Sequence, residues 1–321
     1  MGGAWSRRKQ KTDRRNGKEF LLRVAAVVLV FGFICYLFCT INLSAVSDTS
    51  YEYYGQDWIL SYDGQEKIVD LPSSEPVKAG DAYTISHKVS WNLPQDCWLM
   101  FRSLQQHVEI YLDETLLYTY PSVHYLADLT PNHWNLVKLP EDARGKMLTI
   151  RLYTEYPSFS GKMGELYLGR YEALFHQVRG RYAFPFWTGF LAGAMGCVIL
   201  LVSLFFRTYR SLRAELALGF LLIFSSFWLC GEAKMPFVHV DPLVQYFLVF
   251  QSMFLIPMCF YLHITGKMKE KQKHISLGPV WLNLCVMTVC TFLQLTGIRD
   301  YPRMLPVIHG VVAVVLSLIH I

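Results

Sequence analysis

The central part of this sequence has almost no cysteine. Of the eight cysteines in the chain, only Cys97 falls between residues 47 and 182, so no disulfide can form within that block. This excludes a small, disulfide-stapled secreted domain, and the absence of any Cys-x-x-Cys pair excludes the usual zinc motifs. The other seven cysteines lie in apolar runs, where cysteine behaves as a small hydrophobic residue. We therefore expect no metal site and no structural disulfide in the central block.

Charged residues are also scarce, at 17% of the chain, whereas 53% of residues are hydrophobic and 15% are aromatic. Such a balance is typical of membrane proteins. The net charge of +5 is unevenly spread: residues 47–182 hold 12 Lys/Arg and 18 Asp/Glu, a net of −6, and the remainder carries +11. Because positive residues are retained on the cytoplasmic side, the acidic block is predicted to be extracellular. The basic pI then gives no reason to expect a nucleic-acid partner.

The amino-terminal region combines positive charge with one apolar run. We interpret residues 1–19 as a basic cytoplasmic tail and residues 20–46 as a transmembrane anchor. The uncharged run at 24–41 has 18 residues, near the lower limit for a helix that spans a bilayer. A cleaved signal peptide is the alternative, because Ala45-Val46-Ser47 has a small-x-small form. Both interpretations place the residues that follow outside the cell.

Residues 48–181 contain no run long enough to cross a membrane. In HVEIYLD, Val108, Ile110 and Leu112 alternate with polar residues, which is the period of two of a half-buried strand. Closely spaced strands without helical repeats between them predict an antiparallel β-sandwich, and the length suffices for one core. The segments expected to form strands are DWILSY, KIVDL, AYTISHKV, CWLMFRSL, HVEIYLD, LLYTY, HWNLVKLP and KMLTIRLYTEY.

Residues 182–321 are predicted to form a multi-span helical bundle. Five uncharged runs occur there, at 183–206, 216–231, 242–266, 275–298 and 304–321. With a cytoplasmic amino terminus, the loops 207–213 and 266–274 should face the cytosol, and 232–241 and 299–303 the exterior. The first two loops carry seven Lys/Arg and the other two carry three, the asymmetry that this topology requires.

The final six residues, LSLIHI at 316–321, form an apolar hexapeptide. In this reading frame the same hexapeptide is encoded by the end of a widely used transposon sequencing adapter. We therefore expect that residues 316–321 derive from the adapter and that the native gene continues. A chance apolar hexapeptide is the alternative, and a stop codon directly after Ile321 in the native locus would establish it.

The order of these parts resembles that of bacterial seven-transmembrane receptors with diverse intracellular signalling modules. The segments VEIYLDETLLYTY at 108–120 and HWNLVKLPEDARGKMLTIRLY at 133–153 also resemble the jelly-roll sugar-binding domains that accompany glycosidases. The resemblance implies a receptor whose sandwich detects an extracellular small molecule or sugar and signals to a cytoplasmic effector, such as a GGDEF diguanylate cyclase or a histidine kinase. No effector motif is present, and five helices follow the sandwich where the family has seven. We expect no enzymatic activity and no cofactor in the residues present.

Four residues of the sandwich are candidate ligand contacts, because aromatic faces stack on sugar rings: Trp134, His133, Trp91 and Tyr156. Trp134 follows Pro131 and Asn132 in a stretch that looks like a loop. Trp98, in the apolar run CWLMF, is interpreted as a core residue. The carboxylates Glu109, Asp113 and Glu114 are interpreted as solvent-facing and not as a glycosidase pair, since spacing alone cannot place two of them across a cleft.

Polar residues within the apolar runs are interpreted as hydrogen-bonding groups between helices. They are Glu215, Gln245, Gln251, His263, Asn283 and Gln294. The pair Gly189 and Gly193 predicts close helix packing. Lysines 267, 269, 271 and 273 are expected to contact anionic membrane lipids, and a homodimer is left open.

Two alternatives to a receptor stay open. A transporter or channel component with a sugar-binding ectodomain would require broken helices and polar groups meeting at mid-membrane, with Gln251 and Asn283 as the positions concerned. An adhesion module that uses the helices only as an anchor ranks last, because five spans exceed what an anchor needs. The predicted location is the plasma membrane, with a cytoplasmic amino terminus and residues 48–181 outside.

Overall fold

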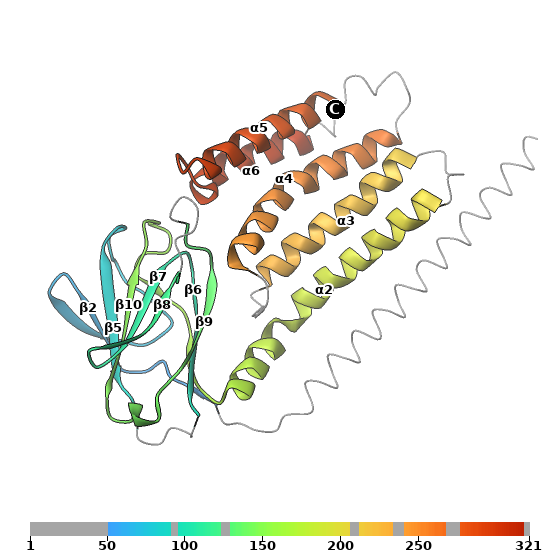
Figure 1. Ribbon diagram of the computed structural model, residues 1–321. Helices are drawn as coiled ribbons and strands as arrows, with labels where there is room; N and C mark the ends of the chain where they lie inside the picture. Colours follow the sequence, from blue (N-terminus) through green and yellow to red (C-terminus); the bar gives the residue numbers. More distant parts are fainter. Residues whose placement is uncertain are drawn as a thin grey trace, which may run out of the picture.

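The computed structural model describes residues 51–90, 96–122, 129–205, 212–233, 241–267 and 277–317. The expected basic tail and membrane anchor, residues 1–46, lie outside these ranges, as do Trp91 and most of the lysine cluster at 267–273. Within the described residues, a sheet-rich region comes first and a helical region follows (Figure 1). This order matches the one expected from the sequence.

The sheet-rich region consists of antiparallel strands in two main sheets. The four-stranded sheet has the order β1 (Tyr51–Tyr53), β12 (Leu166–Gly169), β6 (Trp98–Ser103), β9 (His133–Lys138). The six-stranded sheet has the order β3 (Gln65–Val69), β2 (Trp58–Tyr62), β5 (Ala82–Lys88), β10 (Met147–Tyr153), β7 (His107–Leu112), β8 (Thr115–Tyr120). A third, small ladder pairs β4 (Ser73–Ser74) with β11 (Lys162–Met163). All eight expected segments contain strands; β1, β4, β11 and β12 were not anticipated.

One hydrophobic core lies between the two main sheets. On β7 the inward residues Val108, Ile110 and Leu112 are buried and alternate with partly exposed ones, which confirms the predicted period of two. Leu99 and Phe101 of the other sheet belong to the same cluster. Cys97 is buried here as well, which agrees with its interpretation as a small hydrophobic residue, and burial raises the pKa of its thiol to about 11.

Within the described residues the helical region has five helices, four of which are long and apolar enough to cross a membrane. These four are α2 (Tyr171–Phe205), α3 (Leu212–Glu232), α4 (Pro242–Gly266) and α5 (Gly278–Leu295). The fifth, α6 (Tyr301–Ser317), is apolar but has only 17 residues. Several large apolar side chains are exposed on these helices, including Phe184, Trp281 and Phe292. This surface fits a multi-pass membrane protein.

The change from sheet to helix lies at Arg170, eleven residues before the boundary expected at 181/182. The first turns of α2 carry charges, so a search for uncharged runs detects only the later, apolar part of this helix. Leu174 and Val178, one helical turn apart, are buried against Met100 and Tyr167 on the outer face of the four-stranded sheet. One helix therefore packs on the sheet and continues as the first membrane span.

Glycines allow α2 and α3 to pack closely. A methyl carbon placed on Gly193 would lie 2.6 Å from Ser226 Oγ, and one on Gly189 would lie 2.9 Å from Cys230 Sγ. Neither distance leaves room for a side chain. The predicted close-packing face is therefore confirmed, and α3 is its partner.

Five of the six polar residues singled out in the spans form hydrogen bonds between helices, as predicted; for Glu215 no such bond is found among the described residues. The Gln251 side-chain amide donates to Thr291 Oγ1 at 2.9 Å and to the Tyr301 hydroxyl at 2.6 Å. The Asn283 amide donates to the Phe254 carbonyl at 2.6 Å. His263, Gln245 and Gln294 also bond to other helices. These contacts tie the helices to one another.

The sheet region lies at one end of the helices (Figure 1). Glu232 and Asp241, at the two ends of one connecting loop, border a cavity with the sheet region, and Asp300 of another loop bonds to Tyr156. These two loops are the ones that the charge count assigned to the side of the sandwich. At the opposite end of these helices, Gly266, the last residue of α4, packs on Ala214 near the start of α3.

Candidate functional site

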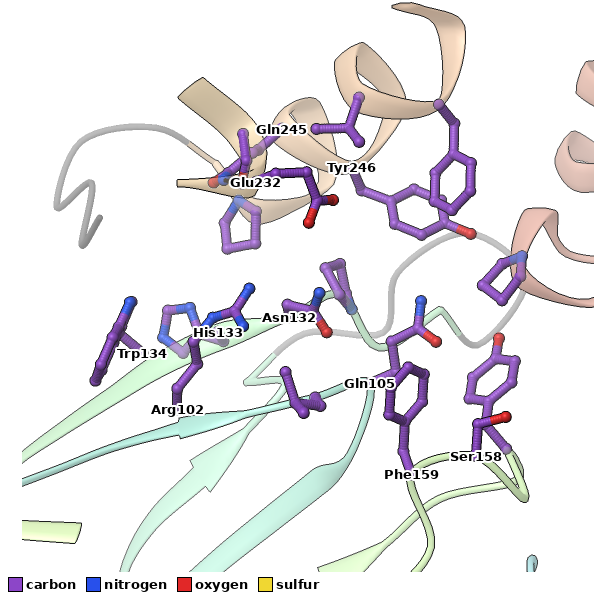
Figure 2. A pocket seen from close by; sticks show the side chains of 18 of the residues that line it. Arg102, Gln105, Asn132, His133, Trp134, Ser158, Phe159, Glu232, Gln245 and Tyr246 are labelled. Atoms are coloured by element: carbon purple, nitrogen blue, oxygen red, sulfur yellow. Dashed lines mark hydrogen bonds between the residues drawn. The ribbon is translucent and has the colours of Figure 1, made fainter. Parts of the chain in front are cut away.

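A cavity of about 1020 Å³ lies where the sheet region meets the helices. Figure 2 shows its two walls, with strands on one side and helix ends on the other. Residues from β6, β8 and β9 and from the loop at 156–159 form one wall, and the ends of α3, α4 and α6 form the other. A molecule in this cavity would contact both regions of the protein.

The sheet wall is the outer face of the four-stranded sheet. Arg102 on β6 pairs in register with Trp134 on β9, so the two side chains are neighbours on one face. Residues two positions back, Met100 and Trp98, point the same way and are covered by α2. The helix thus covers one end of this face and leaves Arg102 and Trp134 bordering the cavity.

Hydrogen bonds from side chains to backbone carbonyls fix the part of the cavity wall near Gln105. Gln105 has a positive φ of 51°, unusual for a residue with a side chain, and its carbonyl accepts a hydrogen bond from Thr154 Oγ1 at 2.7 Å. The side-chain amide of Gln106 donates to the carbonyls of Phe159 at 3.0 Å and Lys162 at 2.8 Å. These bonds position the loop at 156–159 beside Gln105.

The helix wall contains two carboxylates in different settings. Asp241 caps α4, since its Oδ1 accepts from the backbone N–H of Leu243 at 2.7 Å and of Val244 at 3.3 Å. Glu232 is the last residue of α3, and its side chain points toward the cavity (Figure 2). Gln245 donates from its side-chain amide to the Gly231 carbonyl at 2.9 Å, joining α4 to the end of α3.

Two polar contacts connect the sheet region to α6 and the residue before it. The Tyr156 hydroxyl donates to Asp300 Oδ2 at 2.5 Å, and Arg303 Nη2 lies 3.2 Å from Glu155 Oε2. The Arg303 guanidinium also lies over the Tyr156 ring, 5.4 Å from its centre. Burial, together with the charge of Asp300, raises the pKa of Tyr156, so its hydroxyl stays a donor.

Tyr156→Phe should loosen this connection. The variant leaves Asp300 without its strongest hydrogen bond, and a bond to a charged group contributes about 2 kcal/mol. We expect a loss of that size in the free energy of unfolding and faster amide exchange at residues 155–160, measured by hydrogen exchange on the full chain in nanodiscs. The matched control is Tyr153→Phe, whose hydroxyl makes only a 3.3 Å bond to the neighbouring Glu155. Equal exchange in both variants would contradict the prediction.

His133 begins β9 and lies in a largely apolar setting. Its ring stacks on Tyr120, with ring centres 4.2 Å apart and planes 10° apart. Burial disfavours the imidazolium and lowers the pKa of His133 to about 4 from its ordinary 6.5. The ring is therefore neutral in the folded protein at physiological pH.

The stability of the protein should consequently depend on pH through His133. Below pH 6.5 the unfolded chain binds a proton that the folded chain does not, so the free energy of unfolding falls as the pH is lowered toward about 4. The slope contributed by one such group is at most about 1.4 kcal/mol per pH unit. His133→Phe keeps the stacking and should flatten part of this slope in thermal unfolding between pH 7 and pH 4. Burial lowers the pKa of His87 too, so some slope should persist. Identical slopes with and without the substitution would contradict this assignment.

Three of the four predicted ligand contacts line the cavity: Trp134, His133 and Tyr156. Trp91 lies outside the described residues. Trp134 is on strand β9 and not in a loop, and its ring packs near Tyr182 of α2 at 6.4 Å. The stacked face of His133 is likewise occupied by Tyr120, so neither ring offers two free faces to a sugar.

Other residues singled out from the sequence have structural roles. Trp98 is half-buried between the sheet and α2, in edge contact with Tyr171 at 5.4 Å, and is not part of the core between the sheets. Glu109 is paired with Arg151 at 3.3 Å. Asp113 accepts a hydrogen bond from the backbone N–H of Met147 at 2.9 Å. These contacts give Glu109 and Asp113 structural roles.

The sequence did not reveal Arg102, Gln105 and Glu232 as cavity residues. A signal for Arg102 exists, because the strand CWLMFRS is apolar on both faces, so its outward face must also be covered. A charged residue on such a face is unusual. No comparable signal marks Glu232, whose place at the cavity depends on how α3 meets the sheet.

No known protein-family model matches the sequence, and no curated protein shows significant similarity to it. Within the described ranges, no three His, Cys, Asp or Glu side chains gather as a metal ion would require.

Proposed function

We propose that this chain is the sensing part of a transmembrane receptor, and that its ligand occupies the cavity between the sheet region and the helix ends. The observation that carries the proposal is the composition of the cavity, whose walls come from both regions. The ligand is an extracellular small molecule, and a carbohydrate is the class that the family resemblance suggests.

A cavity shared by two regions couples binding to their relative placement. A ligand shifts a conformational equilibrium only by its differential affinity for the two states. Since contacts to both walls exist together only in one arrangement, occupancy would favour that arrangement. The contacts of Tyr156 with Asp300 and of Glu155 with Arg303 lie at the rim and would move with it. The helices would then carry the change across the membrane.

The proposal includes the finer assignments of the sequence. The sandwich is a jelly-roll-like extracellular domain, α6 is a fifth span, and the amino terminus and the basic loops face the cytosol. The helices signal to a cytoplasmic effector beyond the residues present. Cysteine labelling of intact cells tests the orientation: a cysteine placed at Lys269 should react only after permeabilisation, and reaction from the medium would overturn the topology.

The transporter alternative has less support. It needs interrupted helices and polar groups that meet at mid-membrane. Among the described helices each one runs without interruption, and Gln251 and Asn283 are engaged in bonds between helices. No observation specifically favours a transport route.

The experiment that tests the proposal is a ligand screen with a structural readout. Purified full-length chain in nanodiscs is screened by thermal unfolding against separate panels of neutral sugars, amino acids and organic acids. We expect a stabilising compound to slow amide exchange in both walls together, at residues 156–159 and at the start of α4. A stabilising compound that protects neither wall, or only one, would contradict a ligand site at the junction.

A further inference from the structure

Three residues that line the cavity carry a polar group that makes no hydrogen bond or ion pair within the described residues. These groups are the guanidinium of Arg102, the side-chain oxygen of Gln105 and the carboxylate of Glu232. Figure 2 shows Arg102 and Gln105 on the sheet wall and Glu232 on the helix wall opposite. Together they provide one positive group, one neutral acceptor and one negative group.

Arg102 is a mostly covered cation without an ion pair. It makes no hydrogen bond or salt bridge to the part of the chain that the structure describes, and burial lowers the pKa of its guanidinium. Leaving a buried charge unpaired is costly, whereas a guanidinium that meets a carboxylate forms two parallel, charge-assisted hydrogen bonds. The other arginine of the cavity, Arg303, is already engaged with Glu155 at 3.2 Å. Arg102 is therefore the group that would receive an anion.

Gln105 provides an unused acceptor. The residue is only 7% exposed, and its Oε1 has no hydrogen-bond partner. Buried polar groups without partners are rare and costly in folded proteins. The backbone of Gln105 has a positive φ and is held by Thr154, so the residue is fixed in an unusual conformation beside the cavity. If the side-chain amide turned so that this oxygen faced the cavity, a ligand N–H or O–H would satisfy it.

Glu232 is poorly placed for helix stability. It is the last residue of α3, where the partial negative charge of the helix end disfavours a carboxylate. Unlike Asp241, it caps no helix and makes no ion pair among the described residues. Its electrostatic influence reaches Arg102 across the cavity. A ligand cation beside Glu232 would remove this penalty.

We propose that the cavity binds a zwitterionic solute, an amino acid or short peptide with free termini, with its carboxylate on Arg102 and its ammonium group beside Glu232. The inference rests on the proposed ligand site and replaces the carbohydrate suggested by the family resemblance with a dipolar solute. The cavity volume of about 1020 Å³ suits a ligand the size of a short peptide. Gln105, with its side-chain amide turned toward the cavity, would accept a hydrogen bond from a backbone or terminal N–H.

The test uses the full chain in nanodiscs with the twenty free amino acids and a library of alanyl dipeptides at millimolar concentration. The best binder found by thermal unfolding is then titrated by calorimetry, together with its amidated and its acetylated forms. Amidation removes the carboxylate and acetylation removes the ammonium group. We expect each modification to weaken binding about tenfold or more, as the loss of a charge-assisted hydrogen bond should.

Matched variants locate the two ends of the ligand. Arg102→Gln should weaken binding of the unmodified ligand about tenfold and abolish the effect of amidation, while Glu232→Gln should do the same for acetylation. Arg102→Lys, which keeps the charge but loses the two-pronged geometry, should give an intermediate loss. The controls Arg151→Gln and Glu114→Gln remove exposed charges remote from the cavity and should leave affinity unchanged. Circular dichroism confirms that each variant is folded.

The outcomes separate this inference from the proposed function. If none of the amino acids or dipeptides binds, or if amidation and acetylation change nothing, the zwitterion inference is overturned. If a neutral sugar from the wider screen then protects both cavity walls from exchange, the receptor proposal survives with a different ligand. If amidation still matters in Arg102→Gln, the carboxylate binds elsewhere and the inference also fails.

Discussion

Replacing Gly196 with alanine is expected to force α2 away from α3 and to destabilise the helical region strongly. A methyl carbon at this position would lie 2.6 Å from the Gly219 carbonyl oxygen and 2.9 Å from Ile223 Cγ1. The nearer atom belongs to the backbone, so no side-chain rotation can relieve the clash. Overpacking of a close interface typically costs 1–3 kcal/mol, and we expect about 3 kcal/mol here. Thermal unfolding of the full chain in nanodiscs measures the loss.

Gly310→Ala is the matched control. A methyl carbon on Gly310 of α6 meets no atom within 4 Å, so only the intrinsic preference of alanine for helices should act. That preference favours the variant by up to about 1 kcal/mol. The two substitutions are chemically identical but should change stability in opposite directions. Equal effects would show that α2 and α3 are not packed as closely as described.

Trp58→Ala should cause the largest loss in the sheet region. The Trp58 side chain is 0% exposed, lies in the core between the sheets, and donates from Nε1 to the Tyr54 carbonyl at 2.9 Å. Truncating a buried aromatic residue removes its transfer free energy and leaves a cavity, at a cost of about 4 kcal/mol. We expect lower yields of folded protein and faster amide exchange throughout β2, β5 and β10.

The control for this variant is Ile68→Ala on the neighbouring strand β3. Ile68 is 67% exposed, so its truncation leaves no cavity and should cost less than about 1 kcal/mol. If Trp58→Ala slows or leaves unchanged the exchange of the core strands, the assignment of Trp58 to the centre of the core is wrong.

Local patterns were sufficient for the two regions and for most of their elements, though not for the short strands β1, β4, β11 and β12. The alternation in HVEIYLD shows that one face of that strand is buried, and each long uncharged run shows that a helix lies in an apolar environment. Both signals come from residues that are close together in the chain. The start of α2 shows the limit of such patterns. Residues 171–182 are charged and amphipathic, and they are helical because Leu174 and Val178 pack on the sheet. A rule based on uncharged runs cannot detect a helix that is stabilised by a distant strand.

The candidate site was predictable only in part. Aromatic residues that could contact a ligand include three that line the cavity, Trp134, His133 and Tyr156, although the rings of Trp134 and His133 are largely occupied by protein neighbours. The groups without partners, Arg102 and Glu232, are separated by 130 positions and meet only through the fold. Spacing along the chain holds no information about such a pair.

The sequence by itself determined that a sheet region precedes a helical region. It also determined the inward faces of the strands, the apolar helices and the glycine face of α2, because each depends on residues close together in the chain. The charge count also grouped correctly the helix ends that lie beside the sheet region. Tertiary structure alone decided that these ends and the sheet enclose a cavity, and which side chains remain unpaired within it. Whether a side chain in the cavity finds a partner depends on how the sheet region is placed against the helix ends. Contacts between residues far apart in the chain set that placement.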